Sequence, residues 1–444
     1  MFVFLLVLSS MGAVFSFTPP PTPPPSPKAS VVIGQADFNS SNQGTWPAGI
    51  GFSTYIAVDG SGNLWVSDYQ NGWVMEFTQP FTNGESANLE IGAANSSAGS
   101  CTTGNPICEP SGVAFDPSGN LWVGDGQNAS IQEFQAPFSS GEASSVLLGG
   151  FYLNHSPNAT AFGPAGLAFD SSGDLWVADP GHNRVLEFTP PFTTRGAASL
   201  VIGQADFSSN SNSNNQSMLN EPNQMTFDQS GNLWVADSGD NRVLEFKAPF
   251  SNGESASVSI GQPNLLSTAG NTTESTLSNP ESLAFDSHGN LWVADSDNNR
   301  VVEFVPPFTT GMNATVVIGQ TEYFFQGLGT DQSSLYDPEG IAAAPGGNLW
   351  VDDAENYRAL LFVDPASAAT STTTSTSFTF TLPTSSESTT APSTTTSQVQ
   401  TTSGGATTSQ AVPVFPYQLA AVGAFVLVMA GAYALLRRRT VSSA

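Results

Sequence analysis

The tripeptide Leu-Trp-Val recurs six times at a nearly constant interval, and this repetition limits what the chain can fold into. Its tryptophans lie at positions 65, 122, 176, 234, 292 and 350, so the intervals are 57, 54, 58, 58 and 58 residues. A fixed period of this size indicates a repeat architecture, in which each unit buries its apolar face against its neighbours. We therefore expect six equivalent units rather than two or three unrelated domains.

Each unit has the pattern of four short β-strands. In the fifth unit, apolar runs at 283–285, 291–294 and 300–304 are separated by polar turns, the first of which contains Gly289. A fourth run, at 317–320, follows a Pro-Phe turn signal. Short apolar runs punctuated by Asp, Gly and Asn are typical of strands and turns. Four strands per unit predict the blade of a β-propeller.

The fourth strand appears six times, but its first copy precedes the first Trp unit and no copy follows the last one. Its apolar residues are Ile33, Ile91, Leu148, Ile202, Ile260 and Ile318. Residues 31–35 should therefore complete the sixth blade, and such closure removes exposed sheet edges. We predict an all-β chain with a six-bladed β-propeller over residues 31–363, closed by an N-terminal outer strand.

The phrase from Pro280 to Phe304 resembles the NHL repeat. An apolar strand, then Asp-x-x-Gly-Asn-Leu-Trp-Val-Ala-Asp, then Asn-Arg-Val and a Phe, is close to the consensus of that family. The similarity extends over about residues 31–363, although the units are longer than the family's usual repeat. The resemblance implies a propeller but leaves the function open, because the family includes ligand-binding sensor domains, interaction modules and a few lyases.

The N-terminal segment predicts export. Residues 1–16 combine a short apolar run with small residues, which is the pattern of a signal peptide, although no Lys or Arg precedes the run. Residues 17–30 form a Pro-rich linker.

The C-terminal segment predicts a stalk and a membrane anchor. Residues 364–416 are dominated by Ser and Thr, with too few large apolar residues to fold, so we expect disorder there. Residues 417–436 carry no charge and predict a transmembrane helix. The Arg-rich tail 437–444 places the C-terminus in the cytoplasm. We expect a single-pass protein of the cell membrane with its propeller outside.

The charge balance argues against nucleic-acid binding. The chain has 37 acidic and 10 basic residues, a net charge of -27, and such a surface repels phosphate backbones. The partner that we expect is an extracellular protein or a glycan, besides the membrane that the C-terminal helix would cross.

The first turn of five units carries an Asp three residues before a Gly. These residues are Asp59, Asp116, Asp170, Asp228 and Asp286. The spacing is compatible with a calcium loop, but an Asp that accepts backbone hydrogen bonds before a left-handed Gly is ordinary turn chemistry. We expect no cofactor and no metal, with calcium as the alternative.

The second turn of four units carries an Asp five residues before an Arg. The pairs are Asp179 and Arg184, Asp237 and Arg242, Asp295 and Arg300, and Asp353 and Arg358. We expect each pair to form an ion pair within its blade. The first two units have Trp73 and Ser130 at the Arg positions, so that side of the ring is the first place to look for a binding patch.

A polar residue follows each second-turn Asp by three positions. These residues are Asn71, Asn128, His182, Asp240, Asn298 and Asn356. In equivalent blades they would form a ring on one face, which makes them a candidate binding face. Because the same residue types tolerate left-handed backbone, turn geometry predicts the same set, and we favour this structural interpretation.

The sequence contains no recognisable catalytic constellation. The three histidines, His155, His182 and His288, occupy non-equivalent places in their units, and no metal-ligand set or nucleophile with its base is evident. We predict a binding module without catalytic residues. Two alternatives remain: an extracellular metal-dependent lyase or gluconolactonase-like hydrolase, which the resemblance to propeller enzymes implies, and a structural component of a surface coat.

Export also makes modification a prediction. N-glycosylation triplets begin at Asn39, Asn95, Asn128, Asn154, Asn158, Asn215, Asn271 and Asn313.

The two cysteines, Cys101 and Cys108, are expected to form one disulfide, since two cysteines seven residues apart in an exported chain usually close a small loop. Mass analysis without reductant should then find the peptide pair two hydrogens lighter than the free thiols. Alkylation of both thiols in the unreduced protein would contradict the disulfide.

Overall fold

The computed structural model describes residues 26–44, 47–92, 107–149, 157–160 and 162–369, together with the four-residue strands at 14–17, 378–381, 397–400 and 409–412. The chain divides into two units, one of residues 23–371 and one of residues 1–22 and 372–444. In the second unit, β1 (Val14–Phe17) pairs with β26 (Phe378–Thr381), and β27 (Ser397–Gln400) pairs with β28 (Ser409–Val412).

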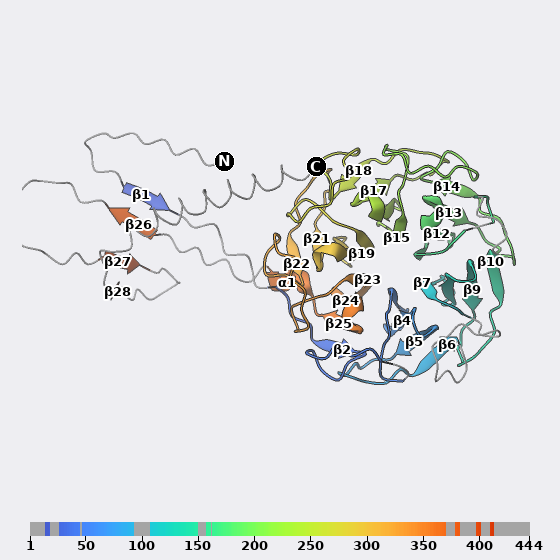
Figure 1. Cartoon of the computed structure of the whole chain (residues 1–444), viewed down its shortest axis with the longest axis horizontal. Helices are drawn as coiled ribbons and strands as arrows, with labels where there is room; N and C mark the ends of the chain where they lie inside the picture. The colour runs from blue at the N-terminus through green and yellow to red at the C-terminus, as the bar shows by residue number, and fades with distance from the viewer. Residues whose placement is uncertain are drawn as a thin grey trace, which may run out of the picture. The chain divides into compact units, whose positions relative to one another are not determined.

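Residues 23–371 form six antiparallel four-stranded sheets that close into a ring (Figure 1). Blade 1 contains β3 (Tyr55–Val58), β4 (Leu64–Asp68), β5 (Trp73–Phe77) and β6 (Leu89–Gly92). Blade 2 contains β7 (Pro110–Phe115), β8 (Leu121–Asp125), β9 (Ser130–Phe134) and β10 (Val146–Gly149). Blade 3 contains β11 (Leu167–Phe169), β12 (Leu175–Asp179), β13 (Arg184–Phe188) and β14 (Leu200–Ile202).

The other three blades repeat this order from the channel outwards. Blade 4 contains β15 (Pro222–Phe227), β16 (Leu233–Asp237), β17 (Arg242–Phe246) and β18 (Val258–Ile260). Blade 5 contains β19 (Pro280–Phe285), β20 (Leu291–Asp295), β21 (Arg300–Phe304) and β22 (Val316–Ile318). Blade 6 contains β23 (Pro338–Ala344), β24 (Asn348–Asp353), β25 (Arg358–Phe362) and β2 (Val31–Ile33).

Short helices complete the first unit. The 3-10 helices η1 (Pro180–His182), η2 (Ser238–Asp240), η3 (Ser296–Asn298) and η4 (Ala354–Asn356) form the second turns of blades 3 to 6, and α1 (Pro365–Ala369) follows β25. Each of the four 3-10 helices ends on a residue in the left-handed region.

Ring closure by the N-terminal outer strand is confirmed. β2 pairs antiparallel with β25, so that Val31 lies opposite Leu361 and Ile33 opposite Ala359. Val32 and Ile33 are fully buried. The sixth blade therefore joins the two ends of the repeat region, and β2 supplies the outer strand of its four-stranded sheet.

The structure describes only part of the predicted segments that precede and follow the ring. The transmembrane residues 417–436 and the tail 437–444 lie outside the described residues, as do residues 1–13 of the signal peptide. The described part of the stalk, residues 364–416, contains α1, β26, β27 and β28. Among the described residues, no helix has the length and apolar character needed to cross a membrane.

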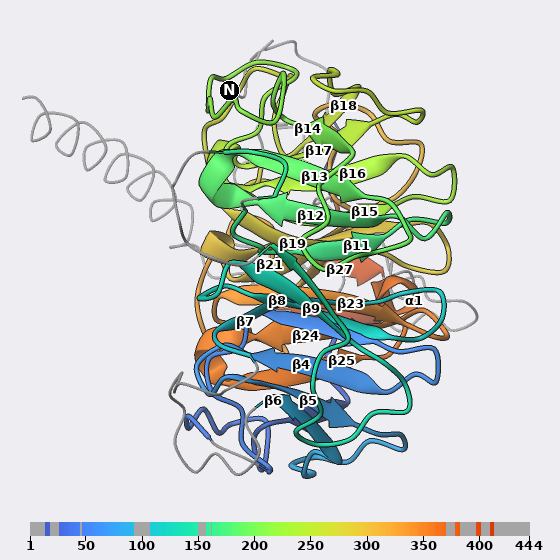
Figure 2. The same ribbon diagram turned by 90° about the vertical axis from the view of Figure 1, so that its right-hand side faces the viewer.

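Aromatic side chains hold neighbouring blades together. The Trp of blade 2, Trp122, packs edge-on against two rings of blade 3, with centroids 5.8 Å from Phe169 and 4.8 Å from Phe192. Blades 1, 3 and 4 repeat this arrangement through Trp65, Trp176 and Trp234. Edge-to-face pairs add to the stabilisation that burial of the rings provides. The side view in Figure 2 shows blades 2 and 3 face to face, with β8 and β9 below β12 and β13.

The first-turn Asp residues belong to the turns, as the structural interpretation of the sequence predicts. In blade 1, Asp59 Oδ1 accepts hydrogen bonds from the backbone N–H groups of Ser61 and Asn63, at 2.8 and 2.9 Å. Its Oδ2 accepts from the Trp65 indole N–H at 3.2 Å. The other four Asp residues make the same bonds to their own turns and tryptophans.

The four Asp–Arg pairs form as predicted. The distances from Arg Nε to Asp Oδ2 are 2.9, 2.7, 2.6 and 2.6 Å in blades 3 to 6, and all eight side chains are almost fully buried. Each Arg also donates to carbonyl groups of long loops, as Arg184 does to Phe207 and Asn158. A buried guanidinium needs this full set of partners because its desolvation is expensive.

Shortening a buried side chain of the closing strand, β2, should destabilise the whole ring. We expect Ile33→Ala to lower the free energy of unfolding by about 2 to 5 kcal/mol, as for other buried aliphatic residues, measured by chemical denaturation. Lys28→Ala, at an exposed position before β2, is the control. Equal stability of the two variants would show that β2 does not close the ring.

Candidate functional site

The predicted polar ring is built into the second turns. Asn71, Asn128, Asn298 and Asn356 each donate from Nδ2 to the Asp three residues earlier, at 2.8 to 3.0 Å. His182 Nδ1 lies 2.8 Å from Asp179 Oδ2, and Asp240 lies 3.0 Å from Arg242. These contacts tie one polar group of each of the six residues to its own turn or blade. Their role as a binding face stays a prediction.

The predicted modification sites lie mostly on the surface where they are described. Asn39, Asn128, Asn158, Asn271 and Asn313 are exposed and Asn215 is half-buried. Asn95 and Asn154 lie outside the described residues, as does Cys101, whereas Cys108 is buried. Glycosylation and the disulfide therefore stay predictions.

The innermost strands begin with residues that differ between the blades. A Pro stands at the entrance of this strand in blades 2 to 6, and the position after it holds Ser111, Ala165, Asn223, Glu281 and Glu339. β3, β7, β11, β15, β19 and β23 are the first strands of their sheets and contact one another around the channel. The entrance of the channel is therefore where this chain departs from its own repeat.

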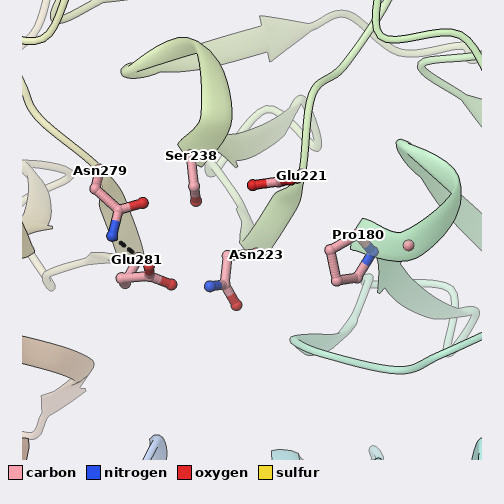
Figure 3. Close-up of a pocket in the computed structure, with 7 residues that line it drawn as sticks. Pro180, Glu221, Asn223, Ser238, Asn279 and Glu281 are labelled. Atoms are coloured by element: carbon pink, nitrogen blue, oxygen red, sulfur yellow. Dashed lines mark hydrogen bonds between the residues drawn. The ribbon is translucent and has the colours of Figure 1, made fainter.

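A cavity of about 270 Å³ lies at this entrance. Its walls come from blades 3, 4 and 5, through Pro180, Gly181, Glu221, Asn223, Ser238, Asn279 and Glu281. Figure 3 shows Glu281 and Asn223 side by side at the base of this group, with Asn279 joined to Glu281 by a hydrogen bond of 2.7 Å. The cavity is thus lined by acceptor oxygens and amide groups.

One hydrogen bond spans the channel. The hydroxyl of Tyr55, on β3 of blade 1, bonds to Oδ1 of Asn223, on β15 of blade 4. Blades 1 and 4 stand on opposite sides of the six-bladed ring. Tyr55 is buried, and burial together with the charges of Glu281 and Glu339 raises its pKa well above 10.0. Tyr55 therefore places a hydrogen-bonded ring across the channel beside two carboxyl groups.

The carboxyl groups of blades 4 to 6 raise one another's pKa values. Burial, followed by the neighbouring Asp337, Asp297 and Glu221, raises the pKa of Glu281 to about 7, against the opposing hydrogen bond from Asn279. Burial raises the pKa of Glu339 to about 10, with further contributions from Glu281 and other carboxylates. We call Glu221, Glu281, Asp297, Asp337, Glu339 and Glu355 the acidic mouth. Among the described residues, none of these six forms an ion pair with Lys, Arg or His.

A buried Asp lies between blades 6 and 1, next to the acidic mouth. Asp352 is fully buried and accepts a hydrogen bond of 2.5 Å from the Ser53 hydroxyl at Oδ1. Burial, opposed by this hydrogen bond, raises its pKa to about 8. Three blades have Ala at the corresponding position, and Pro replaces Ser53 in blades 2 to 6. This junction therefore uses a polar contact where the others use Pro.

Blade 3 contains a separate group of carboxylates. Asp174 replaces the Asn that donates to the first-turn Asp in blades 1, 2, 4 and 5. Asp170, Asp174 and Glu187 thus bring ligand atoms within 4.8 Å of one another. All three side chains are half-buried.

Charge and shape together define what the acidic mouth can bind. Protonated carboxyl groups, amide groups and one tyrosine hydroxyl can donate and accept hydrogen bonds, and ionised carboxylates attract cations. Sequence reasoning missed this site because its residues follow no shared motif. The available signal was the change from Ser and Ala to Asn and Glu at one repeat position.

Comparison with known proteins agrees with the fold. The NHL repeat family model matches residues 108–134, 163–188 and 277–304, which cover parts of blades 2, 3 and 5. No match was found among curated proteins.

Solved structures with similar architecture are distant in sequence. A catalytically inactive virginiamycin B lyase from Staphylococcus aureus, solved with quinupristin, is 15% identical, with 73% of this chain and 87% of that chain covered and a TM-score of 0.41. A streptogramin B lyase is 14% identical, with 73% and 96% covered and a TM-score of 0.43.

A structural genomics protein of unknown function from Bacteroides thetaiotaomicron is 12% identical, with 76% and 74% covered and a TM-score of 0.48. These likenesses carry no ligand or activity over to this chain. The matched repeats and the closed ring of six four-stranded blades make the chain a six-bladed β-propeller of the NHL-repeat type.

Proposed function

We propose that this protein is a binding propeller, displayed outside the cell, whose acidic mouth receives a positively charged group of an extracellular partner. The observation that supports this function is a cavity at the channel entrance that Glu221 and Glu281 line. The other carboxyl groups of the acidic mouth lie close enough to raise the pKa of Glu281 or of Glu339. The protein's net charge of -27 favours the same class of partner, because it attracts cations over long distances.

The raised pKa values favour a cation as the bound group. Two acidic side chains, Glu221 and Glu281, line the cavity, and the charges of the other members of the acidic mouth act on Glu281 or Glu339. Among the described residues, no basic side chain forms an ion pair with any of the six. A guanidinium or ammonium group placed among them would supply the opposite charge and favour the ionised carboxylates. Binding would therefore release protons from Glu281 and Glu339.

The dimensions of the cavity suit a side chain rather than a whole folded surface. A volume of about 270 Å³ admits one long side chain, and carboxylates bind guanidinium groups through paired hydrogen bonds. The natural ligand is then an exposed Arg or Lys side chain of a protein, or an amine-bearing sugar of a glycan. Membrane anchoring through the C-terminal segment would present this site to the cell exterior.

A charged probe and its neutral isostere test this function. We expect full-length protein to bind acetyl-argininamide in calorimetry, and acetyl-citrullinamide about tenfold or more weakly, since hydrogen bonds to charged groups contribute about 1.5 to 3 kcal/mol. Affinity should increase from pH 6 to pH 8, because Glu281, with its pKa of about 7, must lose its proton.

Two variants separate the acidic mouth from general surface charge. Glu281→Gln combined with Glu339→Gln should abolish both the charge preference and the pH dependence. Glu142→Gln, on the hairpin at the other end of the blade strands, should preserve them. Equal binding of the two probes by the wild-type protein would refute the proposed function.

The ligand-free protein should lose stability as the pH rises. The pKa of Glu339 is near 4.5 when unfolded and about 10 when folded, so its contribution is complete below pH 4.5 and is lost progressively above it. We expect Glu339→Gln to raise the melting temperature at pH 8 and to change it little at pH 5. Glu142→Gln should change it at neither pH, and an unchanged Glu339→Gln profile would show that the carboxyl group is not desolvated.

A further inference from the structure

At five junctions between neighbouring blades, a hairpin of the following blade packs over the outer strand of the preceding blade. Each hairpin joins the third and fourth strands and carries a Phe four residues after the Phe that ends the third strand: Phe81, Phe138, Phe192, Phe250 and Phe308. These rings lie 4.8 to 5.1 Å from the Trp of the preceding blade. At five of the six junctions, the side chain that packs against the Trp is therefore a hairpin Phe.

The same hairpins hydrogen-bond the outer strand of the preceding blade. In blade 4, Gly253 N–H donates to the Val201 carbonyl at 3.4 Å and Asn252 Oδ1 accepts from Val201 N–H at 3.0 Å. The hairpin of blade 5 makes the equivalent bonds to Ser259, at 3.1 Å each. The hairpin of blade 1 makes both bonds to Val32. One bond each links the next two hairpins to the preceding blade: Ser140 Oγ accepts from Glu90 N–H, and Arg195 N–H donates to the Leu147 carbonyl. Hairpin and ring together cover each outer strand.

Blade 6 cannot form this hairpin because its fourth strand, β2, comes from the N-terminal side of the propeller. After β25 the chain turns into α1 instead, and Ala366 stands at the position of the hairpin Phe. Ala366 packs against the core cluster that contains Trp292. Ala343 also stands at the inner-strand position where blades 2 to 5 have a Phe. Within the described ranges, Trp292 therefore has no edge-to-face ring partner of the kind that the other five tryptophans have.

A cavity of about 520 Å³ lies at this junction. Blade 5 contributes His288, Asn290, Glu303, Val305, Thr315 and Val316, and the segment around α1 contributes Asp364, Ala366 and Ser367. Figure 1 shows α1 beside β22, the outer strand of blade 5. Val317 on β22 corresponds to Ser259 on β18, but in the described part of the chain no hairpin bonds to its N–H or carbonyl group.

We propose that the junction between blades 5 and 6 is a docking site for an extended peptide of another protein that presents an aromatic side chain. The cavity seats the ring beside Ala366. At the edge of β22, Val317 is 7% exposed, and its N–H and carbonyl groups, to which no hairpin of the described chain bonds, would pair with the peptide backbone once it docks. The peptide would make the contacts that a hairpin makes at each of the other five junctions: a Phe ring against the Trp of the preceding blade and backbone hydrogen bonds to its outer strand. The site is the sixth such junction around the same ring. Docking by addition to a strand edge, with a pocket for one side chain, is a known mode of peptide recognition.

The hairpin of blade 4 supplies a probe. A fluorescein-labelled peptide with the sequence of residues 247–254, Lys-Ala-Pro-Phe-Ser-Asn-Gly-Glu, should bind full-length protein in a polarisation assay. The same peptide with Ala for Phe should bind about tenfold or more weakly, because burying a Phe side chain contributes about 1.5 to 3 kcal/mol. Failure of the Phe peptide to bind the wild-type protein, or equal binding of the two peptides, would overturn the proposal.

Filling the cavity from within gives a second, independent test. Ala366→Phe should abolish binding of the Phe peptide and raise the melting temperature by a few degrees, since the new ring buries apolar surface against the Trp292 cluster. Ala197→Phe, at an exposed position on the hairpin of blade 3, should do neither. Retained peptide binding in a folded Ala366→Phe protein would place the peptide elsewhere and contradict the proposal.

A segment of the chain itself is the competing occupant. Phe378 and Phe380 follow the last residue of α1, Ala369, by nine and eleven positions. If the Phe peptide binds the Phe378→Ala, Phe380→Ala double variant but not the wild-type protein, the site belongs to the chain's own segment and the proposed external partner is wrong. Equal peptide affinity of both proteins supports the external partner.

Discussion

The packing of each Trp against the next blade is the interaction on which the ring depends. A single blade is a small antiparallel sheet that cannot bury both faces by itself, and the Trp on its second strand extends the core across the junction. Trp65, Trp122, Trp176, Trp234, Trp292 and Trp350 are at most 1% exposed. Because each Trp needs the following blade, stability is shared around the ring, and β2 must complete blade 6 for the last junction to be buried.

The buried Asp–Arg pairs explain how blades of this length stay ordered. Arg242 and Arg300 each bind the Asp at the end of the preceding strand, and their remaining N–H groups donate to carbonyls of the long loops outside the blades. One side chain thereby satisfies several backbone acceptors that would otherwise lack partners. In blades 1 and 2 the corresponding Trp73 and Ser130 are also buried, so these two side chains offer no patch to solvent.

The sequence predicted the fold because its evidence was repeated. The tryptophans fixed the number of blades, and the unmatched strand at 31–33 located the closure. The same method could not find the acidic mouth, since comparison of repeats identifies the residues that blades share, such as Asn298 and Asn356, and these proved to be hydrogen-bonded within their turns. Glu281 and Glu339 stand where blades 2 to 4 have Ser, Ala and Asn. Recognising them as neighbours requires knowing that the innermost strands of different blades meet at the channel.

The two proposed sites have a common origin in the asymmetry of a nominally symmetric ring. Equivalent positions in identical blades would surround the channel with one kind of side chain, whereas the six residues of the acidic mouth all come from blades 4 to 6. Closure adds a second asymmetry, because a blade assembled from both ends of the repeat region cannot connect its third and fourth strands. The hairpin missing from blade 6 leaves Ala366 and the edge of β22 where the other five junctions have a Phe and a hairpin bonded to the outer strand. Closing the sheet at β2 thus creates an opening one blade away, and this follows from chain connectivity whatever the identity of the ligand.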